Sequence, residues 1–193
     1  GQEKRYHLPK TCPACAESVS RPKGEAVTRC TNTSCPARRK QSIEHFGSKG
    51  ALDIDGLGEQ LVCQLVDEDL LQSPADLFDL RLQDVSSLER MGHKSAKNLL
   101  KAIDKARENV TLPRLIFALG MPLVGQSTAA QLAREFQTLD QLAGAKEHDL
   151  VRMEGVGRTM ASAIVQWFDN KKNQQMIKKL RNYGIDPKVS RTS

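Results

Sequence analysis

Apolar residues along this chain of 193 residues recur mostly at intervals of three and four from residue 45 onward. That spacing places them on one face of an α-helix, and no run favours a strand beyond the first 40 residues. Helices are predicted at 59–68, 73–78, 85–88, 94–108, 111–118, 127–136, 139–143, 148–152, 158–168 and 170–183. Ser73-Pro74 and Leu112-Pro113 are typical helix starts, and Tyr183-Gly184 is a typical end. The pattern predicts a mainly α fold.

A short glycine motif recurs between these helices, at 56–58, 90–92, 123–125 and 155–157. The last residue of each motif is Gly58, Gly92, Gly125 or Gly157, and these glycines lie 34, 33 and 32 residues apart. An apolar residue directly precedes each of them, and in the last three copies an alanine follows four residues later, at the first buried position of the outgoing helix. The repeat indicates four tandem helical hairpins. Units this small should pack in two pseudo-symmetric pairs, the first with the second and the third with the fourth.

The start of each outgoing helix is suited to binding phosphate. Its first amides have no acceptors within the helix, and the helix dipole adds partial positive charge there. Lysine and arginine can reinforce these amides, and hydroxyls can donate to phosphate or, alternatively, cap the helix. The candidate DNA-binding residues are Gly92, His93, Lys94, Ser95, Lys97, Gly125, Gln126, Ser127, Thr128, Gly155, Gly157, Arg158, Thr159 and Met160.

Charge distinguishes the first copy from the other three. The chain has a net charge of +6, yet residues 51–89 hold ten acidic side chains and one basic side chain, whereas residues 90–110 hold six basic and two acidic ones. Dense acidic groups repel phosphates, so the first hairpin is expected to be structural or to face a basic partner. The aromatic residues Trp167, Phe168, Phe136, Phe117 and Phe78 are too sparse for base stacking and are expected in packing roles.

Four cysteines form two close pairs near the N-terminus. Cys12 and Cys15 are spaced C-x2-C, and Cys30 and Cys35 are spaced C-x4-C. Two such pairs predict a closed tetrahedral zinc site that is structural and not catalytic. Two disulfides are the alternative, which the absence of a secretory signal pattern disfavours. So small a module has little apolar core, and zinc binding should supply most of its folding free energy.

Other polar residues near the cysteines have simpler interpretations. His45 lies outside the usual ligand spacing and is expected at the surface or at a helix start, and Cys63 is expected as a small core residue. The basic side chains of the module could meet phosphates or could serve only solubility. These side chains are Arg21, Lys23, Arg29, Arg38, Arg39 and Lys40.

The expected organisation is a leading segment over 1–10, a zinc module over 11–40, a helical domain over 41–185 and a flexible tail over 186–193. No apolar run approaches the roughly 20 residues that span a bilayer. We therefore expect a soluble, cytoplasmic monomer that does not bind membranes.

The order of four-cysteine module and hairpin repeats resembles the C-terminal half of bacterial NAD-dependent DNA ligase. The resemblance covers roughly residues 8–185, with Arg90 and Leu123 standing where the other two copies have the first hairpin glycine. It is carried by Cys12-Pro13-Ala14-Cys15, Ser34-Cys35-Pro36-Ala37-Arg38-Arg39-Lys40, Ala51-Leu52-Asp53-Ile54-Asp55-Gly56-Leu57-Gly58, Pro74-Ala75-Asp76-Leu77-Phe78 and the later hairpins.

This resemblance implies sequence-independent binding of nicked duplex DNA, in replication and repair, by one part of an enzyme that uses NAD in other domains. Those adenylation, OB-fold and BRCT domains have no counterpart in this chain, and no Lys-x-Asp-Gly motif occurs. We therefore expect no catalytic residue and no activity of this piece alone. Two alternatives stay open: a non-enzymatic repair or docking module, and a base-excision glycosylase whose catalytic acid would be Asp169 or Asp186.

Overall fold

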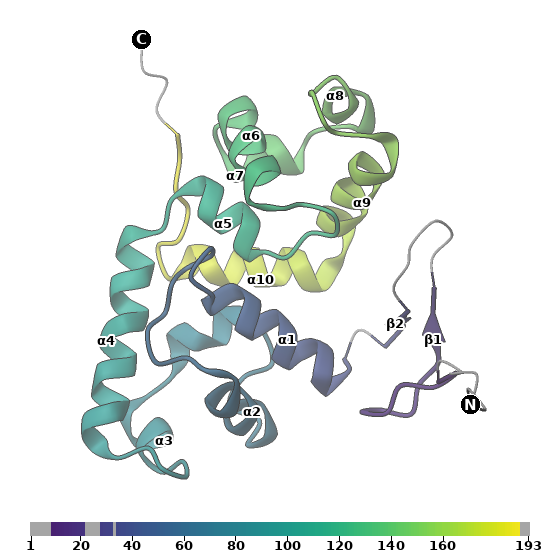
Figure 1. The fold of residues 1–193 in the computed structure, drawn as a ribbon. Helices are drawn as coiled ribbons and strands as arrows, with labels where there is room; N and C mark the ends of the chain where they lie inside the picture. The colour runs from purple at the N-terminus through teal and green to yellow at the C-terminus, as the bar shows by residue number, and fades with distance from the viewer. Residues whose placement is uncertain (1–8, 22–27, 33, 190–193) are drawn as a thin grey trace, which may run out of the picture.

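The computed structural model describes residues 9–21, 28–32 and 34–189, and their architecture is mainly helical, as predicted (Figure 1). The elements in chain order are β1 (Val19–Ser20), β2 (Arg29–Cys30), α1 (Pro36–Gly47), α2 (Glu59–Asp67), the 3-10 helix η1 (Pro74–Asp79), α3 (Leu82–Ser86), α4 (His93–Asn109), α5 (Leu112–Ala118), α6 (Gln126–Phe136), α7 (Leu139–Ala143), α8 (Glu147–Val151), α9 (Arg158–Asp169) and α10 (Lys171–Asn182). Within the described residues, both strands belong to the four-cysteine module, where they pair antiparallel.

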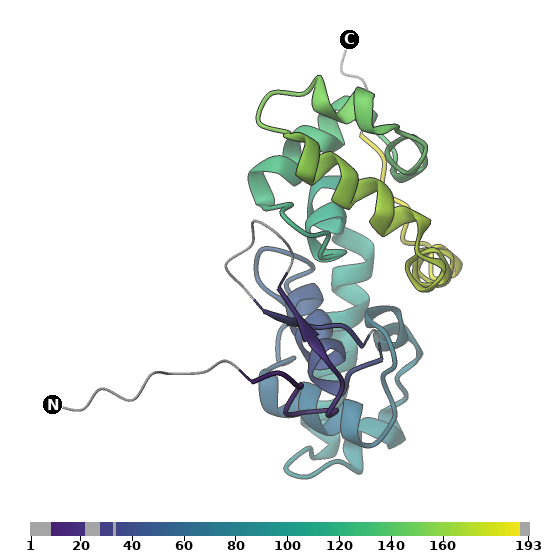
Figure 2. The same ribbon diagram turned by 90° about the vertical axis from the view of Figure 1, so that its right-hand side faces the viewer.

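The helices form two halves along the long axis of the molecule (Figures 1 and 2). Helices α1 to α4 make one half and α5 to α9 the other, while α10 runs between them and contacts both α9 and η1. A single apolar core continues through both halves. The two strands lie beside the N-terminal end of α1, outside the helical bundle (Figure 1).

Two helices differ from the sequence prediction. Helix α1 was missed altogether, because it buries only a short stripe, in which Ile43 and Phe46 are fully covered, and its first turns are polar. Helix α3 begins at Leu82, three residues earlier than the predicted 85–88, because its N-cap is Arg81, a residue that gives no capping signal. The other boundaries differ by at most two residues, and 73–78 forms a 3-10 helix at Pro74–Asp79.

Two side chains are also placed differently from expectation. His45 lies in the last turn of α1, half-buried, with its Nε2 2.7 Å from the carbonyl oxygen of Phe117 and its ring packed edge-on against the Phe117 ring. It is therefore neither a helix-start nor a fully exposed surface residue, but part of the joint between the two halves. Cys63 is half-buried on α2 and is not a core residue. The five aromatic residues named above do pack on or within the core, as predicted.

The halves are also joined by Arg114 of α5. Its Nε donates to the carbonyl oxygen of Ala51 at 2.6 Å, and its Nη2 donates to that of Lys49 at 2.9 Å. Nη2 also lies 3.9 Å from a carboxylate oxygen of Asp53. This arginine thus holds the loop that leads into the first glycine turn against the second half of the molecule.

A second joint involves Asp76 of η1, a half-buried carboxylate. One oxygen accepts from the backbone amides of Gln72 at 2.8 Å and Ser73 at 2.6 Å, and the other pairs with the Lys179 ammonium of α10. Desolvation opposes ionisation of Asp76, but these donors outweigh it and hold the pKa of its carboxyl below the ordinary value of 3.8. The charged carboxylate therefore ties the first half to the last helix.

We expect Asp76→Ala to lower the free energy of unfolding by about 2 kcal/mol, because it removes a helix cap and one partner of a partly buried ion pair. Because the folded-state pKa is depressed, this contribution is present above the ordinary carboxyl pKa and is lost as pH falls through the folded-state value. Urea denaturation at pH 7 and at pH 3 measures both effects. Glu89→Ala, at an exposed carboxylate, is the control; equal loss in the two variants would contradict the assignment.

Candidate nucleic-acid interface and metal centre

All four glycine motifs form the same tight turn. The apolar residue before each second glycine donates its amide to the carbonyl three residues earlier, at 3.1 to 3.3 Å. The third residue of the turn has a positive φ, as in a type II turn. These residues are Gly56 (φ 83°), Arg90 (φ 61°), Leu123 (φ 67°) and Gly155 (φ 78°). The two copies that lack the first glycine therefore have the same backbone as the two copies that have it.

The second glycine of each motif is the N-cap of the following helix. Gly58, Gly92, Gly125 and Gly157 have φ between −75° and −88° and ψ between 165° and 179°, which any residue can adopt. A Cβ atom added to any of the four would meet nothing within 4 Å. Neither backbone strain nor packing within the protein requires glycine here. Open space beside uncapped amides is suited to the close approach of an outside group.

The residues that follow these glycines are accessible. His93, Lys94, Ser95 and Lys97 on α4 are exposed, as are Gln126 and Ser127 on α6 and Arg158 and Thr159 on α9, while Thr128 and Met160 are half-buried. The hydrophobic side of each motif is inside: Val124 and Val156 are buried, as are the alanines at 96, 129 and 161. The pattern of apolar positions read from the sequence thus separates a packed face from an open one.

Hydroxyl groups near the turns do not cap the helices. The N-cap position in each case is glycine, and no side chain caps these helix starts. Among the described residues, the hydroxyls of Ser95, Ser127, Thr128 and Thr159 form no hydrogen bond within the protein. The capping alternative is therefore not what the structure shows; Ser95, Ser127 and Thr159 are exposed, and Thr128 is half-buried.

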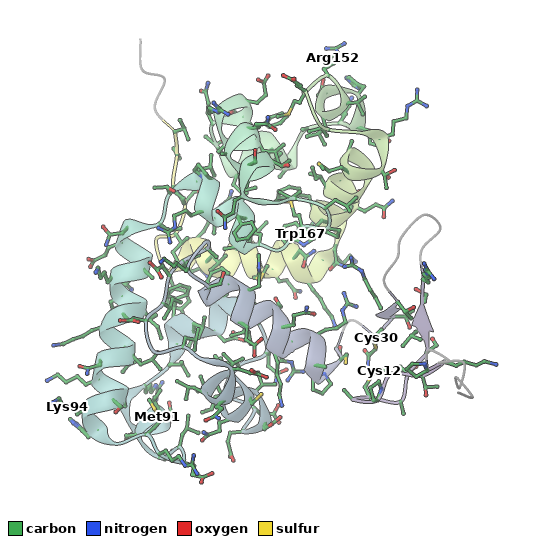
Figure 3. All side chains as sticks on the ribbon, in the orientation of Figure 1. Cys12, Cys30, Met91, Lys94, Arg152 and Trp167 are labelled. Atoms are coloured by element: carbon green, nitrogen blue, oxygen red, sulfur yellow. The ribbon has the colours of Figure 1, made fainter. Side chains whose placement is uncertain are left out.

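Cations at the turns differ from cations at the helix joints. Lys40 pairs with Asp67 at 2.8 Å, and Arg181 with Asp140 at 2.6 Å, each linking two elements. Lys94, Lys97 and Arg158 form no ion pair with any residue that the structure describes. Figure 3 shows Lys94 at the lower end of α4 and Arg152, just before the fourth turn, at the opposite end of the molecule. Lys94 and Arg152 thus lie at opposite ends of the helical part.

The first turn has the same backbone but acidic surroundings. Asp53, Asp55 and Glu59 are exposed around Gly56 and Gly58. Asp53 faces Arg114, the one cation of the other half that reaches this loop by a described contact. The first hairpin therefore has at least one structural role, which is to join the halves.

The four predicted zinc ligands converge. The Sγ atoms of Cys12, Cys15, Cys30 and Cys35 all lie within 4.8 Å of one another, with 3.8 Å between Cys12 and Cys35 and 3.5 Å between Cys15 and Cys30. A tetrahedron with zinc–sulfur bonds of about 2.3 Å has sulfurs about 3.8 Å apart. No described pair is close to the roughly 2.05 Å of a disulfide. The set fits a four-thiolate zinc centre, which leaves no open coordination position.

The thiols of this site are in unequal environments. Amide donation from Ala14 lowers the pKa of the Cys12 thiol to about 7, whereas desolvation raises the pKa of the Cys30 thiol to about 12. Four thiolates this close repel one another unless a cation neutralises them. A divalent metal is therefore the group that lets all four sulfurs be thiolates together.

The zinc module is continuous with the first helix. Cys35 is the N-cap of α1, and its carbonyl accepts the first helical hydrogen bond, from Arg39. Arg38 donates back to the carbonyls of Cys30 and Asn32 at 3.2 and 3.3 Å, and Arg39 lies 3.7 Å from Asp69, just past the end of α2. Arg38, Arg39 and Lys40 thus have contacts within the protein, while Lys23 lies outside the described residues.

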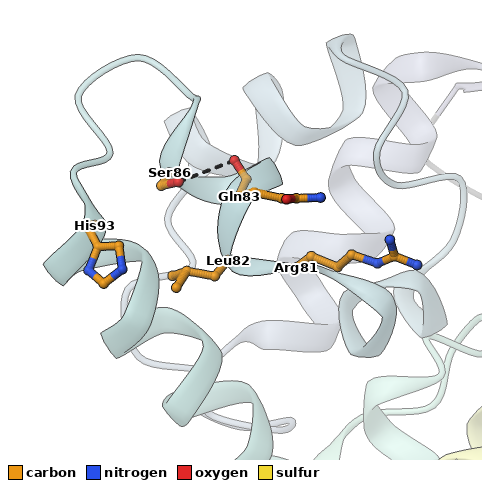
Figure 4. A pocket seen from close by; sticks show the side chains of 5 residues that line it. All are labelled: Arg81, Leu82, Gln83, Ser86 and His93. Atoms are coloured by element: carbon orange, nitrogen blue, oxygen red, sulfur yellow. Dashed lines mark hydrogen bonds between the residues drawn. The ribbon is translucent and has the colours of Figure 1, made fainter.

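A shallow pocket lies beside the second turn, between α3 and the start of α4 (Figure 4). It is open to solvent and is lined by Arg81, Leu82, Gln83, Ser86 and His93. The Ser86 hydroxyl donates to the backbone carbonyl of Gln83 at 3.3 Å. The pocket lacks an enclosed space or paired titratable groups, and it offers no catalytic arrangement.

Comparison with known proteins supports this description. Residues 11–37 match the C4 zinc finger domain of NAD-dependent DNA ligases, residues 49–105 match a SAM-like helix-hairpin-helix tandem, and residues 114–177 match a helix-hairpin-helix motif. The last two matches each contain two of the four turns. They therefore agree with a first half and a second half of related construction.

Similar whole proteins are named DNA ligase. The chain is 47% identical to that of Desulfosudis oleivorans and 41% identical to that of Rubrobacter xylanophilus, each over 186 residues. Both alignments cover 96% of this chain and 27% of the relative. The chain thus spans little more than a quarter of the length of these relatives. Among the described residues, no helix is both long and apolar enough to cross a membrane.

Proposed function

Since the chain has the C4 zinc finger and helix-hairpin-helix region found in DNA ligases, we propose that it is the DNA-binding C-terminal part of an NAD-dependent ligase. In this role it holds nicked duplex DNA, independently of base sequence, while other domains of the longer protein perform the chemistry with NAD. The proposed contacts are phosphates of the DNA backbone and the exposed amides, hydroxyls and cations of the second, third and fourth turns.

The observation that carries the proposal is the repeated open turn. A Cβ atom at any of the four N-cap glycines would point into open space, and the amides that follow the last three have no side-chain cap. Backbone amides can contact phosphates but cannot read base edges, so binding through these amides would not depend on base sequence. Separation of the second and fourth turns along the molecule (Figure 3) suits contacts spread along a duplex.

In this proposal, zinc has a structural role. Cys12, Cys15, Cys30 and Cys35 would hold it, and the bound ion would supply charge neutralisation and folding free energy to a module with few apolar residues. Because Cys35 is also the N-cap residue of α1, the module orients the first helix of the hairpin region. The chain's own contribution to ligation is to position the nick for other domains, which is a proximity effect.

We expect the isolated chain to bind nicked duplexes of unrelated sequence with similar affinity and to form no covalent adenylate with NAD. If three turns each contact one phosphate, affinity should fall about 40-fold between 50 and 200 mM salt. Fluorescence anisotropy with two sequences, each nicked and intact, measures binding, and intact-protein mass spectrometry detects adenylate. Binding insensitive to salt would contradict the phosphate contacts. An adenylate would contradict the proposal that other domains perform the chemistry with NAD.

A glycosylase has no support in the described geometry. Asp169 is the exposed last residue of α9, and Asp186 lies 3.5 Å from the guanidinium of Arg181 in an ion pair. Neither carboxylate lines the pocket beside the second turn. A non-enzymatic repair or docking module would share every feature of the DNA surface, and identification of the complete reading frame distinguishes it from the ligase.

A further inference from the structure

The loop between α1 and α2 runs along the seam between the two halves of the molecule. Its residues 48–53 follow α1 and lead into the first glycine turn, and Figure 1 shows this loop beside α5. Arg114 of α5 binds two carbonyl oxygens of the loop, that of Ala51 at 2.6 Å and that of Lys49 at 2.9 Å. Because the guanidinium is planar and holds its donors in a fixed fork, this pair of bonds fixes the orientation of the loop as well as its position.

The same loop contacts the third turn. A Cβ atom added to Gly50 would overlap the side-chain amide of Gln126 and would lie 3.2 Å from the ring of Phe117. Gln126 is the first residue of α6, directly after the N-cap glycine of the third turn. Across the seam, a Cβ atom added to Gly120 would lie 3.5 Å from the ring of His45. The lack of a side chain at Gly50 therefore lets the start of α6 pack against the first half.

These seam contacts set the distance between turns of different halves. The second turn precedes α4, whose 17 residues extend about 25 Å before α5 begins the second half. Residues 110 and 111 connect α4 to α5. The third turn follows α5, and the first residue of its helix packs on the loop that Arg114 holds. Without the bonds from Arg114, the third and fourth turns would be free to shift relative to the second.

We propose that Arg114 is a positioning residue for DNA binding, which holds the third and fourth turns in register with the second so that one duplex meets all three together. This inference rests on the proposed phosphate contacts, and it gives the acidic first hairpin a part in DNA binding without a contact to DNA. Sites held in a fixed relation bind one ligand more tightly than the same sites joined loosely, because each further contact is intramolecular and preorganised. Arg114 itself contacts the loop and no phosphate.

The test is a double-variant cycle in the binding of a nicked duplex, measured by fluorescence anisotropy at about 50 mM salt, where weak binding stays measurable. We expect Arg114→Ala to lower affinity about tenfold. The blocked background carries Gly125→Val and Gly157→Val, which obstruct both turns of the second half. There we expect Arg114→Ala to change affinity less than about twofold, because only the first half then binds and its relation to the second no longer matters.

Arg107→Ala is the matched control for the loss of an arginine. Arg107 pairs with Asp104 at 3.1 Å within α4, and its side chain is 36% exposed, against 41% for Arg114. Its substitution removes the same charge without touching the seam. We expect it to change affinity less than about twofold in both backgrounds.

A second variant reaches the seam from the side of the loop. Gly50→Val places a branched side chain against Gln126, and it should show the same pattern as Arg114→Ala: about a tenfold loss alone and little loss in the blocked background. Circular dichroism and thermal unfolding check that each variant is folded at the temperature of the assay.

Equal losses from Arg114→Ala in the two backgrounds would overturn the inference, because a phosphate contact by Arg114 itself, or a general loss of stability, acts in both alike. Wild-type affinity in the Arg114→Ala variant would overturn it as well, and in either case the proposed function would stand. Failure of the wild-type chain to bind any duplex would instead overturn the proposed function, and the positioning role with it.

Discussion

Removal of the metal is expected to unfold the zinc module while most of the helical part stays folded. The described module contains two strands of two residues each, and its fully buried cysteine is a metal ligand, Cys35. Structural zinc binding in comparable sites is worth about 10–16 kcal/mol near pH 7, far more than such short strands can supply. The loss should reach the first turn of α1, because Cys35 is its N-cap.

The measurement is a two-dimensional amide NMR spectrum with and without a strong chelator, together with metal analysis. One zinc per chain and collapse of the module's peaks are the expected results, with core residues of α5 and α6 unshifted. Cys15→Ser should act in the same direction, whereas Cys63→Ser, at the cysteine outside the cluster, should keep full metal content. Less than half an equivalent of zinc in freshly reduced protein, with disulfides present, would contradict the site.

Substitution of the N-cap glycine is expected to weaken DNA binding strongly in the hairpins with basic surroundings and little in the acidic first hairpin. Gly157→Val or Gly125→Val places a branched side chain where a phosphate would approach, and we expect each to weaken DNA binding about tenfold and to reduce the salt slope by about one. Gly58→Val is the matched control. It makes the same substitution at the same backbone position, but in a segment with ten acidic side chains and one basic one, and it should change affinity little.

Charge reversal tests the same ranking without altering glycine. Arg158→Glu and Lys94→Glu should weaken binding at least as strongly as the glycine variants, because both cations are free of ion pairs in the described structure and a carboxylate there repels phosphate. Because a Cβ atom at the N-cap glycines meets nothing, folding should be kept, and circular dichroism checks this. A folded Gly58→Val protein that had lost binding, together with normal binding by Glu59→Lys, would show that the first hairpin is a full DNA contact.

Much of this organisation could be predicted from sequence because short local motifs mark the metal ligands and the starts of the helices. The cysteine spacing has few physical interpretations, and the glycine motifs fixed the starts of α2, α4, α6 and α9 to within one residue. In each case a short local motif, a cysteine pair or a turn, also takes part in contacts within the folded protein: the cysteines converge, and the apolar residues of the turns are buried. The DNA-binding residues themselves stay predictions, since accessibility alone does not identify a ligand.

The misses also have physical causes. Helix α1 buries Ile43 and Phe46, and it packs against α2, η1 and α5, with the Phe46 ring edge-on to that of Phe78. Periodicity over twelve mostly polar residues does not reveal such contacts. The role of His45 between the two halves could not be predicted, because its partner, the Phe117 carbonyl, lies 72 residues away in sequence. The equal turn geometry at Arg90 and Leu123 could not be predicted from residue type, because isolated residues of these types avoid positive φ. The feature that all four copies share is the backbone hydrogen bond that closes each turn.

The place of α10 has a consequence for synthesis on the ribosome. Lys179 of this helix pairs with Asp76, and Lys172 donates to Ser34 at 2.8 Å, a contact across 138 residues. The ring of its C-cap residue, Tyr183, lies 5.8 Å from that of Phe78 between centroids. The first half is complete in sequence by residue 110, yet its surface around η1 stays uncovered until residues 171–183 leave the exit tunnel. During synthesis from N-terminus to C-terminus, the segment that closes the first half therefore emerges only after all the helices of the second half, α5 to α9.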